Sequence, residues 1–468
     1  MAGSNGSGSH RWVVFLVVAI ALLFFSKYLL IGAQAVLGVM LPGGTPLVSQ
    51  PEKVAAPEPT AYMEATRAPE PTRAVEVVVE EVVTAAPSYE NITLSIWHLW
   101  GSNNLDAIFG VLDDYSRSHP GINFDLYAPT YMQDEVNTAF AAGVGPDIIA
   151  YPNDIIGSQA MQGNIVPLND YGINRITLAS TYKPAAVIGV TWQDQVWALP
   201  ESQEGIALIY NKDLVSTRYL PTNPLDLDDL LAKAKQFATD HPGKTLICNQ
   251  GFAGNDAYHV APIFFGMGVP EYIDENGNVY LDTPAAVRAA QFILDLKQVS
   301  LSDQSYDICY NALINGEVGM WWTGPWAITG IADSGINYGI LPMGRPFVGI
   351  KTLMLTRVAV ERSHDAAALE FMQYFTSPEV EKQLTLANKT IPAATAALED
   401  PEVTRLTDLV GFGKALNLGV PMSPSPFSSV QWASVGDAVY NIWFTYQTPA
   451  EAMTTAQQAA EDAVETMR

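Results

Sequence analysis

Short apolar runs alternate with segments of helical spacing along most of the chain after its first 90 residues. Residues 92–97, 122–127 and 147–151 have the apolar or alternating pattern of strands, whereas residues 105–115 and 134–142 repeat apolar side chains with the period of a helix. Short connections between such elements are typical of parallel βαβ units. The hydrophobic pattern therefore predicts an α/β fold.

Two predicted loops, at residues 98–104 and 152–157, follow the carboxyl ends of predicted strands. In open α/β sheets, ligands bind just outside these ends. The loops and the adjoining strand ends present Trp100, Tyr151 and Asp154. Aromatic rings and a carboxylate in these places are the first candidate ligand contacts.

The same alternation continues in a second block of the chain. Asn276-Gly277 follows two acidic residues that faintly resemble a calcium loop, but its apolar flanks predict a hairpin turn instead. Residues 411–427 are rich in turn-forming residues. The other predicted elements are a strand at residues 245–249 and helices at residues 225–240, 285–299, 364–376 and 378–388, and from residues 430 and 450 onward.

The segment from residue 199 to residue 214 combines charge with a buried strand. Residues 206–210 are an uncharged apolar run, as expected of a strand buried on both faces, and Glu201 and Glu204 directly precede it. A chain that carries charge to the mouth of a buried strand is usually crossing a cleft or passing between layers. The alternative is an exposed loop with solvated glutamates.

Three tryptophans occur close together beside a Gly-Pro break at residues 320–326. Trp321 and Trp322 lie in a predicted strand and are candidates for the core. Trp326 follows the turn, and we place it in a pocket.

The N-terminus predicts a membrane segment and a linker. Residues 12–41 form an apolar run broken by one charge, Lys27, and at ~1.5 Å per residue they exceed a ~30 Å hydrocarbon core. Residues 1–41 are therefore expected to be a membrane anchor, or a signal segment that is cleaved after Ala35. Residues 42–90 are rich in Pro, Glu, Thr and Ala and predict an extended linker.

Composition excludes several classes of partner. The formal net charge of −25 argues against nucleic acid and against anionic membrane surfaces, because both need a basic face. The two cysteines, Cys248 and Cys309, form no disulfide framework or metal-ligand spacing, so that one bridge and two buried thiols both remain open. The six histidines are scattered, and the chain has no glycine-rich phosphate loop. We expect no metal and no cofactor.

An ordered series of short motifs resembles the extracellular solute-binding proteins of carbohydrate ABC importers, in particular the maltose- and maltodextrin-binding group. The resemblance extends from about residue 92 to the C-terminus, and each motif alone is weak. The motifs include Gly145-Pro146-Asp147-Ile148-Ile149, Leu199-Pro200, Leu208-Ile209-Tyr210-Asn211-Lys212-Asp213-Leu214, Gly316-Glu317, Gly324-Pro325-Trp326, Asn337-Tyr338-Gly339 and Pro346-Phe347-Val348-Gly349.

The resemblance implies a two-lobe periplasmic-binding-protein fold. Each lobe would be a mostly parallel sheet flanked by helices, with the ligand cleft between the lobes. Lobe 1 would comprise residues 91–202 plus 348–398, and lobe 2 would comprise residues 203–347 plus 399–468. The charged segment before residue 206 would then be a hinge.

The resemblance also implies roles for individual residues. Glu204, Asp154 and Asp256 match residues that accept hydrogen bonds from sugar hydroxyls. The matches to aromatic residues that stack on sugar rings are Tyr151, Tyr258, Trp326 and Trp432. Carboxylates and aromatic faces together are what a sugar ring, with its apolar face and its rim of hydroxyls, requires.

The expected function is extracytoplasmic capture of a neutral, maltodextrin-like oligosaccharide by hinge closure, followed by delivery to ABC permease subunits. The chain would act as a monomer at the outer face of the membrane and would not be an enzyme. A tethered sugar sensor or adhesion module is the alternative, and a glycoside hydrolase that uses Glu201 and Glu204 is a remote one.

The chain departs from the maltose-binding pattern at three positions. Where the pattern carries basic residues, this sequence has Ser102, Ile155 and Gly436. The candidate site residues then include no cation, so that an acidic sugar would meet carboxylates without a partner. We expect discrimination against uronates and sugar phosphates.

Overall fold

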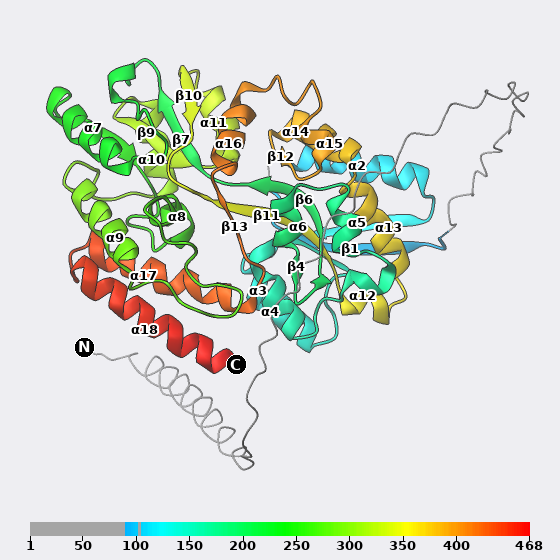
Figure 1. The fold of residues 1–468 in the computed structure, drawn as a ribbon. Helices are drawn as coiled ribbons and strands as arrows, with labels where there is room; N and C mark the ends of the chain where they lie inside the picture. The colour runs from blue at the N-terminus through cyan, green and yellow to red at the C-terminus, as the bar shows by residue number, and fades with distance from the viewer. Residues whose placement is uncertain (1–88, 102–103) are drawn as a thin grey trace, which may run out of the picture. The chain divides into compact units, whose positions relative to one another are not determined.

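The computed structural model describes residues 89–101 and 104–468, which are drawn in colour in Figure 1. The predicted anchor at residues 1–41 lies outside the described residues, as does nearly all of the predicted linker at residues 42–90. Within the described part, no helix is both long and apolar enough to cross a membrane.

The first sheet contains the parallel strands that the N-terminal alternation predicts. Its strands are β1 (Ile92–His98), β2 (Ile122–Tyr127), β3 (Ile148–Pro152), β6 (Leu199–Glu204), β11 (Phe347–Leu355), β12 (Ile391–Pro392) and β13 (Val420–Pro421). The order is β12-β6-β11-β3-β1-β2, with β13 paired to β11. β1 is parallel to β2 and β3, whereas β11 is antiparallel to β3 and β6, so that the later strands extend a parallel core into a mixed sheet.

Helices cover this sheet and close its hydrophobic core. They are α2 (Leu105–Ser118), α3 (Met132–Ala141), α4 (Ile156–Met161), α5 (Arg175–Ala179), α6 (Pro184–Gly189), α12 (Arg357–Glu361), α13 (Asp365–Phe375), α14 (Pro378–Asn388) and α15 (Thr395–Leu398). Aromatic rings join α2 and α13 to the sheet, because Phe371 lies 5.2 Å from Tyr115 and 4.6 Å from Phe124, measured between ring centroids. A small hairpin of β4 (Thr191–Trp192) and β5 (Gln195–Val196) lies between α6 and β6 in the chain.

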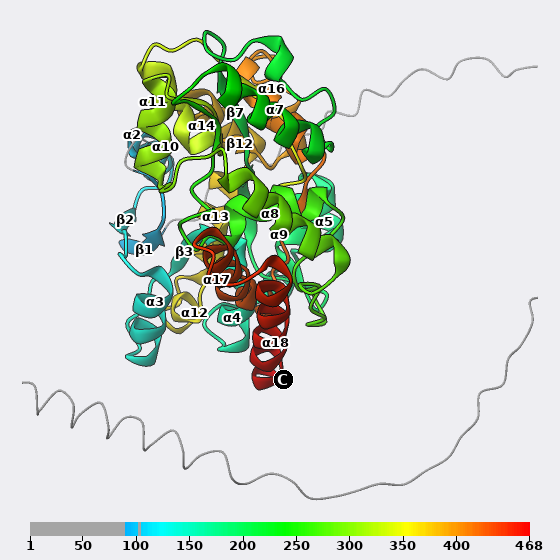
Figure 2. The ribbon, with the colours of Figure 1, turned by 90° about the vertical axis from the view of Figure 1, so that its left-hand side faces the viewer.

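The second sheet is smaller and has the order β10-β7-β9-β8. β7 (Ala207–Asn211) is antiparallel to β9 (Val318–Thr323) and to β10 (Tyr338–Leu341), and β8 (Thr245–Cys248) is parallel to β9. Its helices are α7 (Leu227–Asp240), α8 (Ala257–Gly266), α9 (Pro284–Lys297), α10 (Tyr306–Ile314), α11 (Ile328–Asp333), α16 (Thr407–Leu416), α17 (Gln431–Trp443) and α18 (Pro449–Met467). α17 and α18 lie side by side in Figures 1 and 2.

Adjacent tryptophans of β9 serve opposite faces of the second sheet. Trp322 packs into the apolar cluster that contains residues of α7, α8, α9, α17 and α18, and Trp321 packs into the cluster that contains residues of α10, α11 and α16. Successive side chains of a strand point to opposite faces, which explains this division. Both tryptophans are fully buried, as the sequence predicted.

Three segments connect the two sheets. β6 belongs to the first sheet and β7 to the second, with Gly205 and Ile206 between them, and the chain returns from β10 into β11. Figure 1 shows β11 running from one group of elements to the other, with the β13 segment beside it. Asn153 joins β11 to the segment after β13, since its amide donates to Met422 O at 2.8 Å and its Oδ1 accepts from Ile350 N at 3.0 Å.

The hydrophobic pattern located most elements within a few residues. The Asn276-Gly277 turn is confirmed, because Gly277 N donates to Asp274 O and Asn278 O accepts from Asp274 N. The sequence analysis described residues 411–427 as rich in turns. This is wrong for residues 411–416, which belong to α16. Gly411 and Gly413 suggested turns, but the helix buries Leu409, Gly411, Phe412 and Ala415 on one face.

Cys248 and Cys309 are joined by a disulfide between β8 and α10. The Cα atoms are 5.6 Å apart, and both residues are fully buried in the second lobe's core. The sequence alone could not distinguish a disulfide bridge from two free buried thiols, because the spacing of the cysteines along the chain does not give their distance in space.

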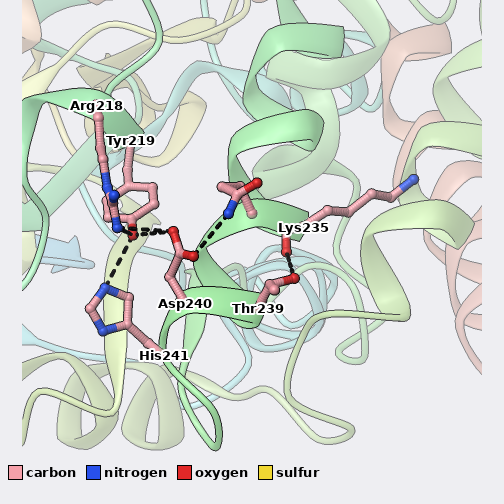
Figure 3. A network of polar contacts seen from close by, with 7 residues as sticks. Arg218, Tyr219, Lys235, Thr239, Asp240 and His241 are labelled. Carbon is pink, nitrogen blue, oxygen red and sulfur yellow. Dashed lines mark hydrogen bonds and ion pairs between the residues drawn. The ribbon is translucent and has the colours of Figure 1, made fainter.

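A polar network fixes the C-terminal end of α7, as Figure 3 shows. Asp240 Oδ2 accepts from Tyr219 Oη at 2.7 Å and from the Arg218 guanidinium at 2.9 Å, and Tyr219 Oη lies 3.3 Å from His241 Nε2. The Tyr219 hydrogen bond lowers the pKa of Asp240. These residues attach α7 to the preceding turn, and none of them lines the cavity described next.

Candidate functional site

A cavity of about 350 Å³ lies where the two sheets approach each other. The first sheet and its helices contribute most of its wall, and Pro325, Trp326 and Thr329 come from the segment after β9 of the second sheet. The lining residues are Leu99, Gly101, Asn104, Pro152, Ser202, Gln203, Glu204, Pro325, Trp326, Thr329, Lys351, Asn388, Lys389, Thr390 and Ile391. Two of the predicted site residues, Glu204 and Trp326, are among them.

Glu204 and Lys351 form an ion pair on neighbouring strands. Glu204 ends β6, and its register partner on β11 is Gly349, two residues before Lys351. The two side chains therefore project from the same face of the sheet, and Lys351 Nζ lies 3.3 Å from Glu204 Oε2. Glu204 and Glu201 together raise the pKa of Lys351 against the opposing effect of burial.

The structure thus places a cation where the sequence analysis expected none. The residues matched to the family included no basic side chain, but Lys351 lines the cavity, and so does Lys389. The expectation of a site without a cation was wrong. Lys351 lies in β11 between apolar residues, and this pattern is typical of a strand buried in the core. Charge in an otherwise buried strand is the signal that could have identified it.

Asp154 is the middle residue of the short turn Asn153–Ile155 after β3, and its Oδ1 is buried. Burial raises the pKa of Asp154 to about 7, its own backbone N–H opposes this shift, and the charge of Glu204 adds to it. The nearby Trp432 indole N–H lowers the pKa of Asp154 slightly. Neither Asp154 Oδ1 nor Trp432 Nε1, however, has a hydrogen-bond partner of good geometry. The carboxyl therefore keeps unused capacity for hydrogen bonds.

Tyr151 is the penultimate residue of β3, three residues before Asp154. Burial raises the pKa of Tyr151 to about 12, and the charge of Asp154 adds to the shift. The phenol is therefore neutral at physiological pH and can both donate and accept a hydrogen bond.

Aromatic rings of the second lobe gather around Phe347, at the start of β11. Tyr258 stacks on Phe347 with a centroid distance of 5.9 Å, Trp432 meets it edge-on at 6.0 Å, and Tyr258 lies 6.4 Å from Trp326. Burial and the charges of Glu204, Asp256 and Asp154 raise the pKa of Tyr258, and its hydroxyl has no hydrogen-bond partner among the described residues. Three of the four predicted stacking residues thus form one cluster beside the carboxylates.

Asp256 has a structural task in addition to its predicted one. It is the N-cap of α8, where its Oδ1 accepts from the backbone N–H groups of Tyr258 and His259, and its Oδ2 lies 2.6 Å from His259 Nδ1. Burial raises its pKa, but the bond to His259 and that residue's charge outweigh burial, so that the pKa is lowered overall. Most of its acceptor capacity is already used.

Trp100 does not face the cavity. It is 7% exposed, stacks on Phe375 at a centroid distance of 5.4 Å, and donates its indole N–H to both oxygens of Glu201 at 3.1 and 3.3 Å. The sequence placed it correctly in the loop after β1, but the loop turns the ring into the core. Its contact with the ligand is therefore not favoured, and its partner Glu201 is a residue that the predicted site omitted.

Trp326 is the most exposed of the predicted aromatic residues, with 38% of its surface accessible. Its ring lies flat against Gly324, where a Cβ atom would stand 2.2 Å from Cη2 and Cζ3 of the indole. Gly324 therefore permits the orientation in which one face of Trp326 is open to the cavity.

We predict that Gly324→Ala displaces the Trp326 ring and lowers ligand affinity by about 1–2 kcal/mol, with little loss of stability because a side chain rather than backbone must move. Gly110→Ala is the matched control, since no atom lies within 4 Å of its Cβ position. Calorimetry and thermal denaturation measure the two effects. Equal affinity of both variants would contradict this account of Trp326.

Comparisons with known proteins agree with this architecture. The model of a family described as bacterial extracellular solute-binding protein matches residues 111–410. A maltotriose-binding protein of Pyrococcus abyssi is 26% identical over 361 residues, which are 74% of this chain and 76% of that protein. A galactooligosaccharide-binding protein of Bacillus subtilis is 21% identical over 350 residues, which are 70% of this chain and 77% of that protein.

Solved structures share the fold. A cyclo/maltodextrin-binding protein complexed with maltotetraose has a TM-score of 0.68 at 22% identity, covering 82% of this chain and 100% of its own. A maltose/maltodextrin-binding domain from Bdellovibrio bacteriovorus bound to maltotriose has a TM-score of 0.69 at 20% identity, covering 80% and 100%. The two-lobe α/β fold predicted from the sequence is confirmed, and the chain belongs to the bacterial extracellular solute-binding protein family.

Proposed function

We propose that the chain captures a neutral oligosaccharide of the maltodextrin type outside the cytoplasm and delivers it to the permease of an ABC importer. The family is one of extracellular solute-binding proteins, and similar chains carry names that refer to maltotriose, maltodextrin and galactooligosaccharides. Because these names differ in the sugar, they favour the oligosaccharide class more strongly than any one member of it.

The observation that carries this proposal is the meeting of carboxylates and aromatic faces from both sheets. Glu204 ends β6 of the first sheet, and Asp154 lies in the turn after β3. Trp326 lies in the turn after β9 of the second sheet and Tyr258 in α8, 6.4 Å from Trp326, and the charges of Glu204 and Asp154 act on Tyr258. A sugar ring placed here would rest its C–H face on an indole and donate its hydroxyls to carboxyl oxygens. A ligand that touches both lobes favours the closed arrangement of the hinge.

We assign lobe 1 to residues 91–202 plus 348–398 and lobe 2 to residues 203–347 plus 399–468. The separate hydrophobic clusters around the two sheets support this division. β6 extends to Glu204, which supports a hinge at Gly205 and Ile206, slightly beyond the boundary that the sequence predicted.

Seven of the eight predicted residues remain the proposed ligand contacts: Tyr151, Asp154, Glu204, Asp256, Tyr258, Trp326 and Trp432. Trp326 and Glu204 are the strongest, because both line the cavity. Asp256 is expected to act chiefly by holding the N-terminus of α8, which carries Tyr258. We add Lys351 to this set.

The alternatives are less well supported. A hydrolase would need two carboxyl groups that reach the scissile bond, but Glu201 is bound by Trp100 and does not line the cavity. A tethered sugar sensor would bind in the same way, and a permease encoded by adjacent genes would favour transport. We propose that the protein is a monomer. Residues 1–41 would anchor it at the extracytoplasmic face of the cell membrane, or it would be secreted if the chain is cleaved after Ala35.

A thermal-shift screen of the full chain against neutral mono- and oligosaccharides tests the proposed function. Binding to the native state alone raises the melting temperature by mass action. We expect maltotriose or a longer neutral oligomer to raise it and glucose to have a smaller effect. A screen in which no carbohydrate raises the melting temperature would contradict the proposal.

Small-angle scattering tests the hinge. We expect the radius of gyration of the full chain to decrease when ligand saturates the wild-type protein. The Trp326→Ala variant at equal ligand concentration is the control and should show a smaller decrease. An unchanged radius in the saturated protein would rule out closure.

A further inference from the structure

A β-bulge lies beneath the cavity, between β6 and β11. Lys351 pairs with Ser202, whereas the next residue, Thr352, pairs with Pro200, so that Glu201 is the extra residue on β6. Along a regular strand, Glu201 and Ser202 would face opposite sides of the sheet. A bulge re-aims a side chain, and such bulges are common beside binding sites.

The contacts of Glu201 show what the bulge achieves. Its carboxylate is buried, accepts two hydrogen bonds from the Trp100 indole, and acts electrostatically on Lys351 and Glu204. Lys351 thus interacts with the charges of two glutamates: its Nζ lies 3.3 Å from Glu204 Oε2, and Glu201 also raises its pKa. Only Glu204 and Lys351 of these three line the cavity.

The charge of this group follows from its surroundings. Burial raises the pKa of Glu201, but Lys351 and the Trp100 indole oppose that shift. The pKa of Glu201 is nevertheless raised overall. The nearby carboxyl group of Glu381 is also buried, and burial raises its pKa well above the ordinary value. With both Glu201 and Glu204 ionised, two carboxylates and one ammonium group would give the cluster a net negative charge. Lys389, the second lysine at the cavity, donates instead to Leu386 O at 3.1 Å.

We propose that Glu201, Lys351 and Glu204 determine the charge specificity of the cleft, with Lys351 donating to a ligand oxygen and the buried Glu201 preventing that ammonium group from attracting an anionic ligand. This inference rests on the proposed function, and it assigns the exclusion of acidic sugars to a residue that the ligand does not touch. Lys351 without Glu201 would form a neutral pair with Glu204 and would tolerate a ligand carboxylate far better.

The test compares matched ligands on the full chain by calorimetry. The ligands are maltotriose and the same trisaccharide with its terminal primary hydroxyl oxidised to a carboxylate. Glu201→Gln keeps the size of the side chain and an acceptor for Trp100, so that maltotriose affinity is expected to stay within about threefold. The affinity for the acidic trisaccharide relative to maltotriose should rise about tenfold, the effect of removing one charge near a partly buried site.

Glu381→Gln is the matched control, because it replaces another buried carboxyl group, one that neither lines the cavity nor acts on Lys351. It should leave the affinity ratio unchanged. An equal ratio in wild type and Glu201→Gln, or an equal rise in Glu381→Gln, would overturn the proposal.

Lys351 variants provide an independent arm if Glu201→Gln does not fold. Lys351→Met is expected to weaken maltotriose binding about tenfold by removing a charged donor, and Lys351→Arg should restore part of the loss. Unchanged maltotriose binding by Lys351→Met would overturn the role of Lys351. Wild-type protein that binds neither trisaccharide nor any other oligosaccharide would instead contradict the proposed function itself.

Discussion

Asp154→Asn is expected to stabilise the ligand-free protein by up to about 4 kcal/mol at pH 7 and above while weakening ligand binding. Burial raises the pKa of Asp154 from 3.8 to about 7, and each unit of difference from the unfolded state corresponds to about 1.4 kcal/mol. Between these values the native protein holds a proton that the unfolded chain has lost. The wild-type carboxyl therefore costs stability as the pH rises from about 4 to 7.

Urea denaturation of wild type and Asp154→Asn across pH 4 to 8 measures this effect. The advantage of the variant should be small near pH 4, increase up to about pH 7 and then level off. Asp154→Asn should also bind oligosaccharide more weakly, since an amide is a poorer acceptor than a carboxylate. A stability difference that is constant with pH would show that Asp154 titrates normally and is not part of a desolvated site.

Trp322→Ala is expected to lower the free energy of unfolding by about 3–5 kcal/mol, the range for removing a large buried aromatic side chain. Trp322 is fully buried in the core of the second lobe and does not line the cavity. Trp326, four residues further, is 38% exposed and lines the cavity, so that Trp326→Ala should retain most of the stability and lose about 1–3 kcal/mol of binding free energy.

Chemical denaturation and titration calorimetry on the two variants separate these effects. Because both substitutions remove the same side chain from the same segment, each serves as the control for the other. If Trp322→Ala lost affinity and Trp326→Ala lost stability, the pocket would lie on the other side of the sheet.

Local patterns were enough to predict most elements of the fold, and two of the proposed contacts, Glu204 and Trp326, line the cavity. The apolar run at residues 206–210 corresponds to β7, a central strand of the second sheet. The Gly-Pro turn after β9 correctly predicted that Trp322 is buried and Trp326 is exposed. The mixed character of both sheets was not predictable in this way, because antiparallel pairs such as β11 with β6 join segments far apart in the sequence.

The charge of the site could not be predicted because it depends on register. Glu201 faces Lys351 only through a one-residue bulge, and sequence spacing does not show which strand of a sheet contains a bulge. Trp100 illustrates the same limit, since its place in a loop beside the cleft was correct but the direction of its side chain was set by contacts with Phe375 and Glu201.

The central claim is that the cavity between the sheets holds an oligosaccharide between a carboxylate and an indole. A crystal structure of the full chain with maltotriose or maltotetraose tests it most directly. We predict a sugar ring stacked on Trp326, with hydroxyls donating to Glu204 and an oxygen accepting from Lys351 Nζ. A saccharide bound elsewhere, for example in the apolar groove beside α16, with the residues around Trp326 unoccupied, would contradict the account.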